Sequence, residues 1–175
     1  LILIPVALAV IIGGLCFPVW TELMRRPGRF AGWSVHTKVT LTATAFLLLL
    51  GIVSITAFEW TNPDTLGNAS VGTKMLSGAF SSVMPRTAGF TAFDYNEAGN
   101  DTELMAMLLM VVGGGSGGTA GGLKVTTVTL LFLIVWAELR GDREVVAFHR
   151  RIPRSIHRQG LAIATLLIGA IAVGT

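Results

Sequence analysis

The sequence predicts an all-α, polytopic membrane protein, and three observations support that prediction. Of the 175 residues, 52% are hydrophobic and 13% are charged, whereas a soluble domain carries about a quarter charged residues. The charges gather in short segments between long apolar runs, which is the pattern of membrane spans. The single cysteine, Cys16, lies within an apolar run and provides neither a disulfide framework nor a cysteine-based metal site.

Four apolar runs are candidate spans: residues 1–20, 39–58, 104–137 and 160–175. A helix needs about 20 residues, at about 1.5 Å per residue, to cross the hydrocarbon core. Pro5, Gly13 and Gly14 interrupt the first run, which membrane helices tolerate, so we expect residues 1–23 to form one transmembrane helix. The last run is too short to cross, so we expect the sequence to be a fragment of a longer protein.

The charged segments between the runs orient the spans. Residues 24–38 and 138–158 are rich in arginine, whereas residues 59–103 carry six acids against Lys74 and Arg86. By the positive-inside rule, the two basic segments face the cytoplasm and the acidic segment faces outside.

The acidic outer segment contains a helix that is too short to cross the membrane. Apolar residues spaced three or four apart predict a helix from Val71 to Val83, about 20 Å long. Pro85 prevents its simple continuation and biases Met84 away from the helical conformation. Non-helical backbone at membrane depth is tolerated only inside protein or beside an aqueous cavity, so the pattern favours a re-entrant loop. The open alternative is an amphipathic surface helix that ends in a Pro-Gly turn.

A re-entrant loop of this sequence can hold a cation. The C-terminal end of the short helix carries partial negative charge and would point inward. The carbonyl oxygens from Thr87 to Phe90 would replace part of an ion's hydration shell. Gly89 suits this role because glycine freely adopts the φ > 0 conformations that let neighbouring carbonyls point the same way.

The third run contains a cluster of small residues: Gly113, Gly114, Gly115, Ser116, Gly117, Gly118, Thr119, Ala120, Gly121 and Gly122. Each interior glycine costs about 1 kcal/mol relative to alanine in a helix, so the cluster predicts a span that is broken into two half-helices. Lys124 follows the cluster inside an apolar stretch, and a membrane-embedded charge is a functional candidate.

Three interpretations of the glycine cluster compete. Its GxxxG spacings would suit a helix-packing seam. A phosphate-binding loop would need an adjacent Gly-Lys-[Ser/Thr] order, which the Gly-Leu-Lys-Val-Thr sequence lacks. A flexible gate beneath the re-entrant loop is the interpretation that we favour.

These motifs resemble those of the Ktr/Trk/HKT family of potassium transporters, and most of all its KtrB-type pore-forming subunits. Residues 85–90 are similar to the family's third selectivity-filter loop, and residues 113–127 to its intramembrane gating loop. Residues 139–153 resemble the link between the third and fourth repeats. The motifs occur in the family's order and together cover most of the chain.

The resemblance implies four helix–pore loop–helix repeats, as in potassium channels, around one pore. In that arrangement the chain divides into the end of the second repeat (1–23), a cytoplasmic loop (24–36), the third repeat (37–138), a basic cytoplasmic linker (139–159) and the start of the fourth repeat (160–175). The third repeat would comprise a helix, a pore helix (71–83), a filter loop (85–91) and a broken helix (104–138).

The resemblance also implies roles for individual residues. Thr87, Ala88, Gly89 and Phe90 would form one filter strand, supported by Arg86, that binds potassium through backbone carbonyls only. The glycine cluster and Lys124 would form the gate.

The resemblance further implies partners and a location. Such subunits form homodimers in the plasma (inner) membrane of bacteria, in contact with lipid and with a cytosolic, KtrA/TrkA-like ring of regulatory subunits. A nucleotide would bind that ring rather than this chain. Uptake would be passive or assisted by sodium, and no nucleic-acid partner is expected.

The sequence offers little support for catalysis. His36, His149 and His157 are scattered among the cytoplasmic segments, and a membrane-embedded enzyme would have only Ser116 and Lys124 as a candidate pair. The remaining alternative is a secondary transporter whose discontinuous helix binds substrate at the glycine cluster.

Overall fold

The computed structural model describes residues 2–28, 30–86, 88–115, 121–141, 146–147, 150–151, 162, 165 and 169. The main elements are α1 (Leu3–Gly14), α2 (Phe17–Arg25), a 3₁₀ turn (Phe30–Gly32), α3 (Val35–Phe58), α4 (Val71–Val83), α5 (Asn100–Val111) and α6 (Val125–Arg140). The expected all-α class is confirmed, with one small addition in the basic linker. There β1 (Val146–Ala147) and β2 (Arg150–Arg151) form a short antiparallel pair.

Helix α3 is the one helix in the described part of the chain that is long and apolar enough to cross a membrane by itself. Its 24 residues rise about 36 Å, which exceeds the hydrocarbon core of about 30 Å. The hydroxyl of Ser34 caps its start by accepting a hydrogen bond from the Thr37 backbone N–H. Thr40 and Thr42 donate their hydroxyls to carbonyls one turn earlier, so neither hydroxyl is unpaired in an apolar setting.

The first apolar run forms two helices rather than the one continuous helix that we expected. Helices α1 and α2 meet at an angle of 96°. The physical reason is Pro18, the second residue of α2, which lacks the N–H that would bond the Gly14 carbonyl and would clash with that carbonyl in a continuous helix. The prediction failed because we weighed only Pro5, Gly13 and Gly14 as interruptions.

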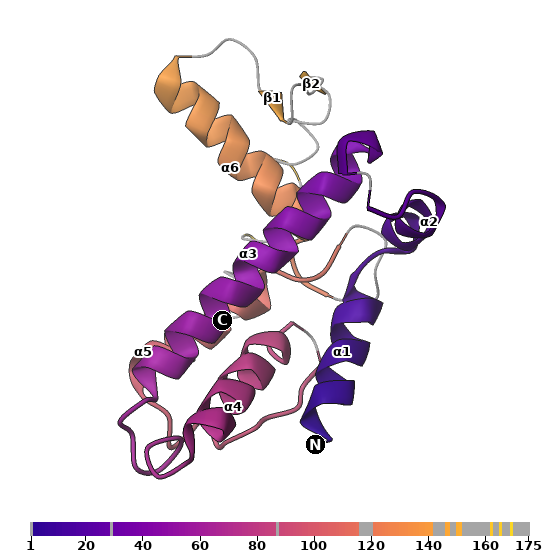
Figure 1. Ribbon diagram of the computed structural model, residues 1–175. Coiled ribbons are helices and arrows are strands. Elements are labelled where there is room, and N and C mark those ends of the chain that lie inside the picture. Colours follow the sequence, from indigo (N-terminus) through magenta and orange to yellow (C-terminus); the bar gives the residue numbers. More distant parts are fainter. Residues whose placement is uncertain are drawn as a thin grey trace.

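Helix α4 lies beside both α1 and α3 (Figure 1). It begins at Val71 and ends at Val83, as the spacing of its apolar residues predicts, and Ser70 caps its first turn. Its approach to α3 is close because two glycines leave room. A Cβ at Gly51 would overlap the Ser82 hydroxyl, and one at Gly78 would overlap that of Thr56. Ser82 uses this proximity to donate its hydroxyl to the Leu48 carbonyl of α3, at 2.9 Å.

The buried carboxylate of Glu59 joins the end of α3 to the start of α5. Its Oε1 accepts hydrogen bonds from the Gly99 N–H (2.9 Å) and the Thr102 hydroxyl, and its Oε2 from the Asn62 amide (2.7 Å) and the Thr65 hydroxyl. The side chain is fully buried. A carboxylate at the N-terminus of α5 also complements the dipole of that helix.

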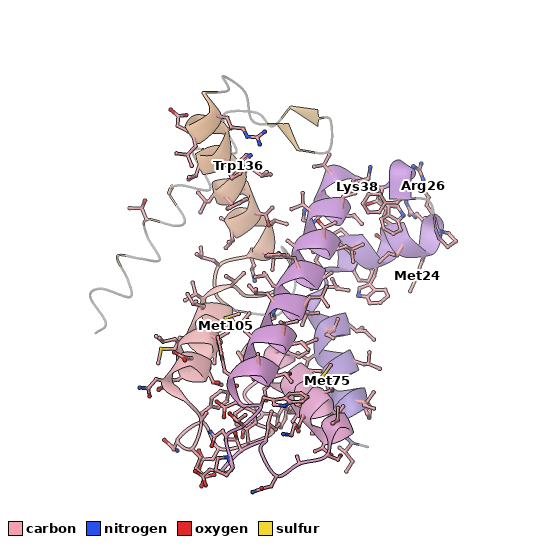
Figure 2. All side chains as sticks on the ribbon, turned by 60° about the vertical axis from the view of Figure 1, so that its left-hand side comes forward. Met24, Arg26, Lys38, Met75, Met105 and Trp136 are labelled. Atoms are coloured by element: carbon pink, nitrogen blue, oxygen red, sulfur yellow. The ribbon has the colours of Figure 1, made fainter. Side chains whose placement is uncertain are left out.

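Basic and aromatic side chains mark one end of the molecule. Figure 2 shows Arg26 and Lys38 together where α2 approaches the start of α3. Trp136 of α6 lies toward the same end, and Met75 of α4 lies in the opposite half. Helix α4 and the Glu59 cluster therefore lie toward the end that the charge pattern assigns to the outside.

Candidate functional site

The turn after α4 continues the helix farther than the sequence suggests. Met84 keeps helical angles (φ −67°, ψ −36°), and its N–H donates to the Phe80 carbonyl at 3.1 Å. The predicted bias of Met84 away from the helix is therefore wrong. Met84 is almost fully buried with Phe80 and Val83 against α1, and this packing outweighs the preference that Pro85 imposes on its predecessor.

The candidate filter segment begins directly after this turn. The Ala88 N–H donates to the Met84 carbonyl at 3.1 Å, and the Ala88 side chain packs on the core that α1 and α4 share. Gly89 has a φ of 71°, the left-handed conformation that the sequence led us to expect. Apart from its chain neighbours, no described residue has an atom within 4 Å of a Cβ built on Gly89, and Phe90 is exposed. Thr87 lies outside the described residues.

Arg86 is buried, and part of its guanidinium group finds no partner in the described part of the chain. Only 8% of the residue is exposed, and no described residue accepts a hydrogen bond from its Nε or from one terminal nitrogen. The side chain lines a cavity of about 20 Å³ whose walls come from α1, α3, α4 and the start of the glycine cluster. A buried donor without a partner is costly, so this guanidinium group is an unusual feature of the core. Its role as a support of the filter stays a prediction.

The third apolar run is broken, as predicted, and the two half-helices are tied at the break. The Gly113 N–H donates to the Leu123 carbonyl at 2.8 Å, and the Leu123 N–H donates to the Val111 carbonyl at 2.9 Å. The Gly114 carbonyl accepts from the Val125 N–H at 3.0 Å, which satisfies an orphan donor in the first turn of α6. These bonds form a neck that holds residues 111–114 beside residues 123–125.

Glycine is required on both sides of this neck. A Cβ at Gly113 would overlap the Gly121 carbonyl oxygen. Gly122 has a φ of 71° and lies so close to the carbonyls of Met110 and Val111 that a side chain would strain it. Ser116, Gly117, Gly118, Thr119 and Ala120 lie outside the described residues.

Lys124 is the N-cap residue of α6. The N-terminus of a helix carries partial positive charge and disfavours a cation. The side chain is partly exposed. The charge therefore lies between Leu123 and Val125, whose backbone groups bond to Val111, Gly113 and Gly114. Its role in a gate stays a prediction.

A contact that the sequence did not predict joins the glycine loop to the break between α1 and α2. The Gly115 N–H donates to the Gly14 carbonyl at 2.9 Å. A Cβ on Gly115 would lie 3.1 Å from the Thr40 methyl and 3.3 Å from the Cys16 nitrogen. Cys16 is fully buried, and its Sγ lies 3.4 Å from Nε2 of His36. The spacing of Gly14 and Pro18, four residues apart, was the available sequence signal, since it predicts a carbonyl without its helical partner.

Arg86, directly before the filter segment, and Gly114, at the start of the glycine loop, border the same cavity. Arg86 and Val83 line it from the side of α4, and Gly114 and Gly14 from the side of the glycine loop and α1. Residues far apart in the sequence are thereby brought together around one small space. Among the described residues, no group of three or more histidine, cysteine, aspartate or glutamate side chains could hold a metal ion.

A membrane-length helix, a half-length helix packed on it and a span broken at glycines define an all-helical, multi-pass membrane protein. Comparison with known proteins narrows this class. The family model described as "Cation transport protein", TrkH, matches residues 1–168. The chain belongs to this TrkH family of cation transport proteins.

Several characterised bacterial proteins are similar in sequence. The Ktr system potassium uptake protein B of Bacillus subtilis is 35% identical over 164 residues, which cover 94% of this chain and 37% of that protein. The protein of the same name from Vibrio alginolyticus is 37% identical over 92% of this chain and 35% of its own length. The potassium/sodium uptake protein NtpJ of Enterococcus hirae is 33% identical over 96% of this chain and 37% of its own length.

A solved structure shares the fold. The potassium transporter TrkH of Vibrio parahaemolyticus aligns with a TM-score of 0.69 over 97% of this chain and 38% of its own, at 20% sequence identity. This chain therefore spans little more than a third of the length of the relatives that it matches.

Proposed function

We propose that the full-length protein takes up potassium through a channel-like pore in the plasma membrane of a bacterium, and that this chain supplies one of four filter strands. The observation that carries the proposal is the shared cavity between Arg86, at the start of the filter segment, and Gly114, at the start of the glycine loop. An ion pathway needs a selective site and a barrier in series, and the residue before the proposed filter strand and a residue of the proposed gate border one space.

The conformation of the filter segment supports ion binding by backbone oxygens. Helix α4 is about 20 Å long, so its C-terminal end lies at membrane depth if it enters from outside. That end carries partial negative charge, which attracts a cation. Gly89 has the left-handed conformation that can turn neighbouring carbonyls the same way. Thr87, Ala88, Gly89 and Phe90 are proposed to bind potassium through their carbonyls.

The glycine loop is proposed to be the gate. Its neck is closed by backbone hydrogen bonds, whereas residues 113–122 supply few side chains that could anchor the loop itself. Lys124 stands at the neck, on a helix end that disfavours its charge. A small shift at the neck would therefore move both the loop and the charge.

The partners are proposed from the relatives. Two of them are named as parts of a Ktr system, which supports a multi-component assembly. We propose a homodimer of pore subunits bound to a cytosolic ring of KtrA/TrkA-like subunits that carries the nucleotide. The relative from Enterococcus is named for potassium and sodium, which supports a contribution of sodium.

The test is ion uptake by the full-length protein, expressed with its regulatory partner in cells that lack potassium uptake. Gly89→Ser is compared with Gly28→Ser. Both glycines have a left-handed φ, of 71° and 72°, and open space at Cβ, so the control carries the same backbone strain outside the filter segment. We expect Gly89→Ser to lose the preference for potassium over sodium and Gly28→Ser to keep it.

Two results would contradict parts of the proposal. Equal selectivity in both variants, at equal amounts of protein in the membrane, would remove Gly89 from the filter. Absence of potassium uptake by the well-expressed wild-type protein would overturn the proposed function. It would favour the secondary transporter, with its substrate bound at residues 113–122.

A further inference from the structure

We infer that the break between α1 and α2 is a seat that holds the glycine loop in its closed position, and that Pro18 creates this seat. The seat consists of the Gly14 carbonyl, the backbone of Cys16 and the methyl group of Thr40. The inference rests on the proposed gating role of the loop, and it assigns the loop a contact outside its own span.

The seat begins with a carbonyl that α1 cannot use. In a continuous helix the carbonyl of Gly14 would accept a hydrogen bond from the N–H of residue 18. Pro18 has no N–H, and the chain turns through 96° at this point. The Gly14 carbonyl instead accepts from the Gly115 N–H at 2.9 Å. A proline in one helix thereby provides the hydrogen-bond acceptor for a loop 100 residues later.

The fit of the seat requires glycine at position 115. A Cβ there would lie 3.1 Å from the Thr40 methyl, 3.3 Å from the Cys16 nitrogen and 3.4 Å from the Gly14 oxygen. All three distances are tighter than, or at the limit of, ordinary van der Waals contact. Gly115 is buried, so an added methyl group would lift the loop rather than turn toward solvent.

The seat also lies next to the hydrogen bonds that join the end of α5 to the start of α6. Gly114 caps the first turn of α6 through its carbonyl, and the next residue donates to Gly14. Movement of the loop away from Gly14 would therefore pull on the start of α6, which carries Lys124 as its N-cap. The bond between Gly115 and Gly14 couples the first apolar run to the proposed gate of the third.

Two substitutions disturb the seat by independent means. Pro18→Ala restores an N–H that can compete for the Gly14 carbonyl, and Gly115→Ala adds a methyl group where no space exists. The matched controls are Pro5→Ala, in the first turn of α1 where an N–H has no helical partner, and Gly13→Ala, whose Cβ would meet nothing within 4 Å.

The experiment uses the full-length protein with its other cysteines replaced by serine. Two quantities are measured without the regulatory partner: potassium uptake, and the rate at which a water-soluble methanethiosulfonate reagent modifies Cys16 in inside-out vesicles. Cys16 is fully buried, and its backbone nitrogen lies 3.3 Å from the Cβ position of Gly115. Its modification should therefore report release of Gly115 and does not depend on potassium transport.

Loss of one hydrogen bond should shift the balance between seated and released loop about fivefold, which corresponds to about 1 kcal/mol. We expect Pro18→Ala and Gly115→Ala to raise partner-independent uptake and the labelling rate by about that factor, and the two controls to change neither. Wild-type uptake with no change in labelling or uptake in either variant would overturn the seat and leave the proposed function intact. Faster labelling in a protein that carries no potassium would retain the seat and overturn the function.

Discussion

Replacement of Glu59 by glutamine tests the buried cluster that positions the outer ends of α3 and α5. The wild-type carboxylate accepts four hydrogen bonds and is fully buried. The new amide nitrogen cannot lie opposite the Gly99 N–H, which is fixed in the backbone, so we expect it to take the place of Oε2. There it faces the Asn62 amide, which donates at 2.7 Å in the wild type, and the Thr65 hydroxyl, which can rotate to accept.

The expected cost follows from this geometry. At least one hydrogen bond to a charged group is lost, and the others become bonds to a neutral amide. Each bond to a charged group is worth about 1.5–3 kcal/mol, so Glu59→Gln should destabilise the protein by about 2–3 kcal/mol. The matched control is Glu103→Gln, because Glu103 is exposed in the first turn of α5 and exposed substitutions rarely change stability by more than about 0.5 kcal/mol.

The pH dependence supplies a second, independent check. Burial raises the pKa of Glu59, but the hydrogen bonds from Thr102, Thr65, Gly99 and Asn62 lower it more, so the pKa lies below its ordinary value of 4.5. A lowered pKa in the folded state contributes stability that is complete above the unfolded value and disappears as the pH falls through the folded value. The difference in stability between wild type and Glu59→Gln should therefore be constant near neutral pH and shrink below about pH 4.5.

The assay is thermal unfolding of the purified full-length protein in detergent, from pH 7 down to pH 3.5. We expect a lower Tm for Glu59→Gln at neutral pH and convergence with the wild type in acid. A Tm equal to that of the wild type at pH 7, with Glu103→Gln also unchanged, would refute the reasoning.

Two further substitutions test the packing that presents the filter segment. Gly51→Ala should separate α3 from α4, since the new Cβ overlaps the Ser82 hydroxyl. We expect it to destabilise the folded protein by about 1–3 kcal/mol. The same Tm assay measures this loss, and an unchanged Tm would contradict the close approach of the two helices. Lys74→Met removes the ammonium group that donates to the carbonyls of Trp60 (2.7 Å) and Gly67 (3.0 Å). We expect a lower Tm and faster proteolysis of the turn at residues 61–69. Unaltered proteolysis would show that the turn does not need the lysine.

The control for Gly51→Ala is Gly72→Ala in the first turn of α4. A Cβ at Gly72 meets nothing within 4 Å, and alanine favours the helix over glycine by about 1 kcal/mol. We therefore expect this variant to keep or raise the Tm. A drop equal to that of Gly51→Ala would mean that glycine is needed in α4 for a reason other than space.

Local signals in the sequence were sufficient to predict two elements. Helix α4 was predictable because its apolar spacing, its Ser70 cap and the following proline all act within a few residues. The break between α5 and α6 was predictable because the glycines oppose helix formation wherever the chain lies. The left-handed conformation of Gly89 was also predictable from the sequence, since few residues other than glycine adopt it.

Contacts between distant segments were not predictable in this way. The sequence shows that Glu59 is acidic, but not that Gly99 and Thr102, about 40 residues later, would surround it with donors. Met84 has a helical conformation because it is buried in the core, although the proline that follows it disfavours that conformation. The sequence likewise does not show that the Gly14 carbonyl would accept a hydrogen bond from Gly115, because only the fold brings these two residues together.

The central claim is that the backbone around Gly89 selects potassium. The most direct test reconstitutes the purified full-length protein, with its regulatory partner, in liposomes and measures the reversal potential under opposed potassium and sodium gradients. We predict a reversal potential close to that of potassium for the wild type and for Gly28→Ser, and a shift toward zero for Gly89→Ser. A Gly89→Ser protein that conducts with the selectivity of the wild type would contradict the account.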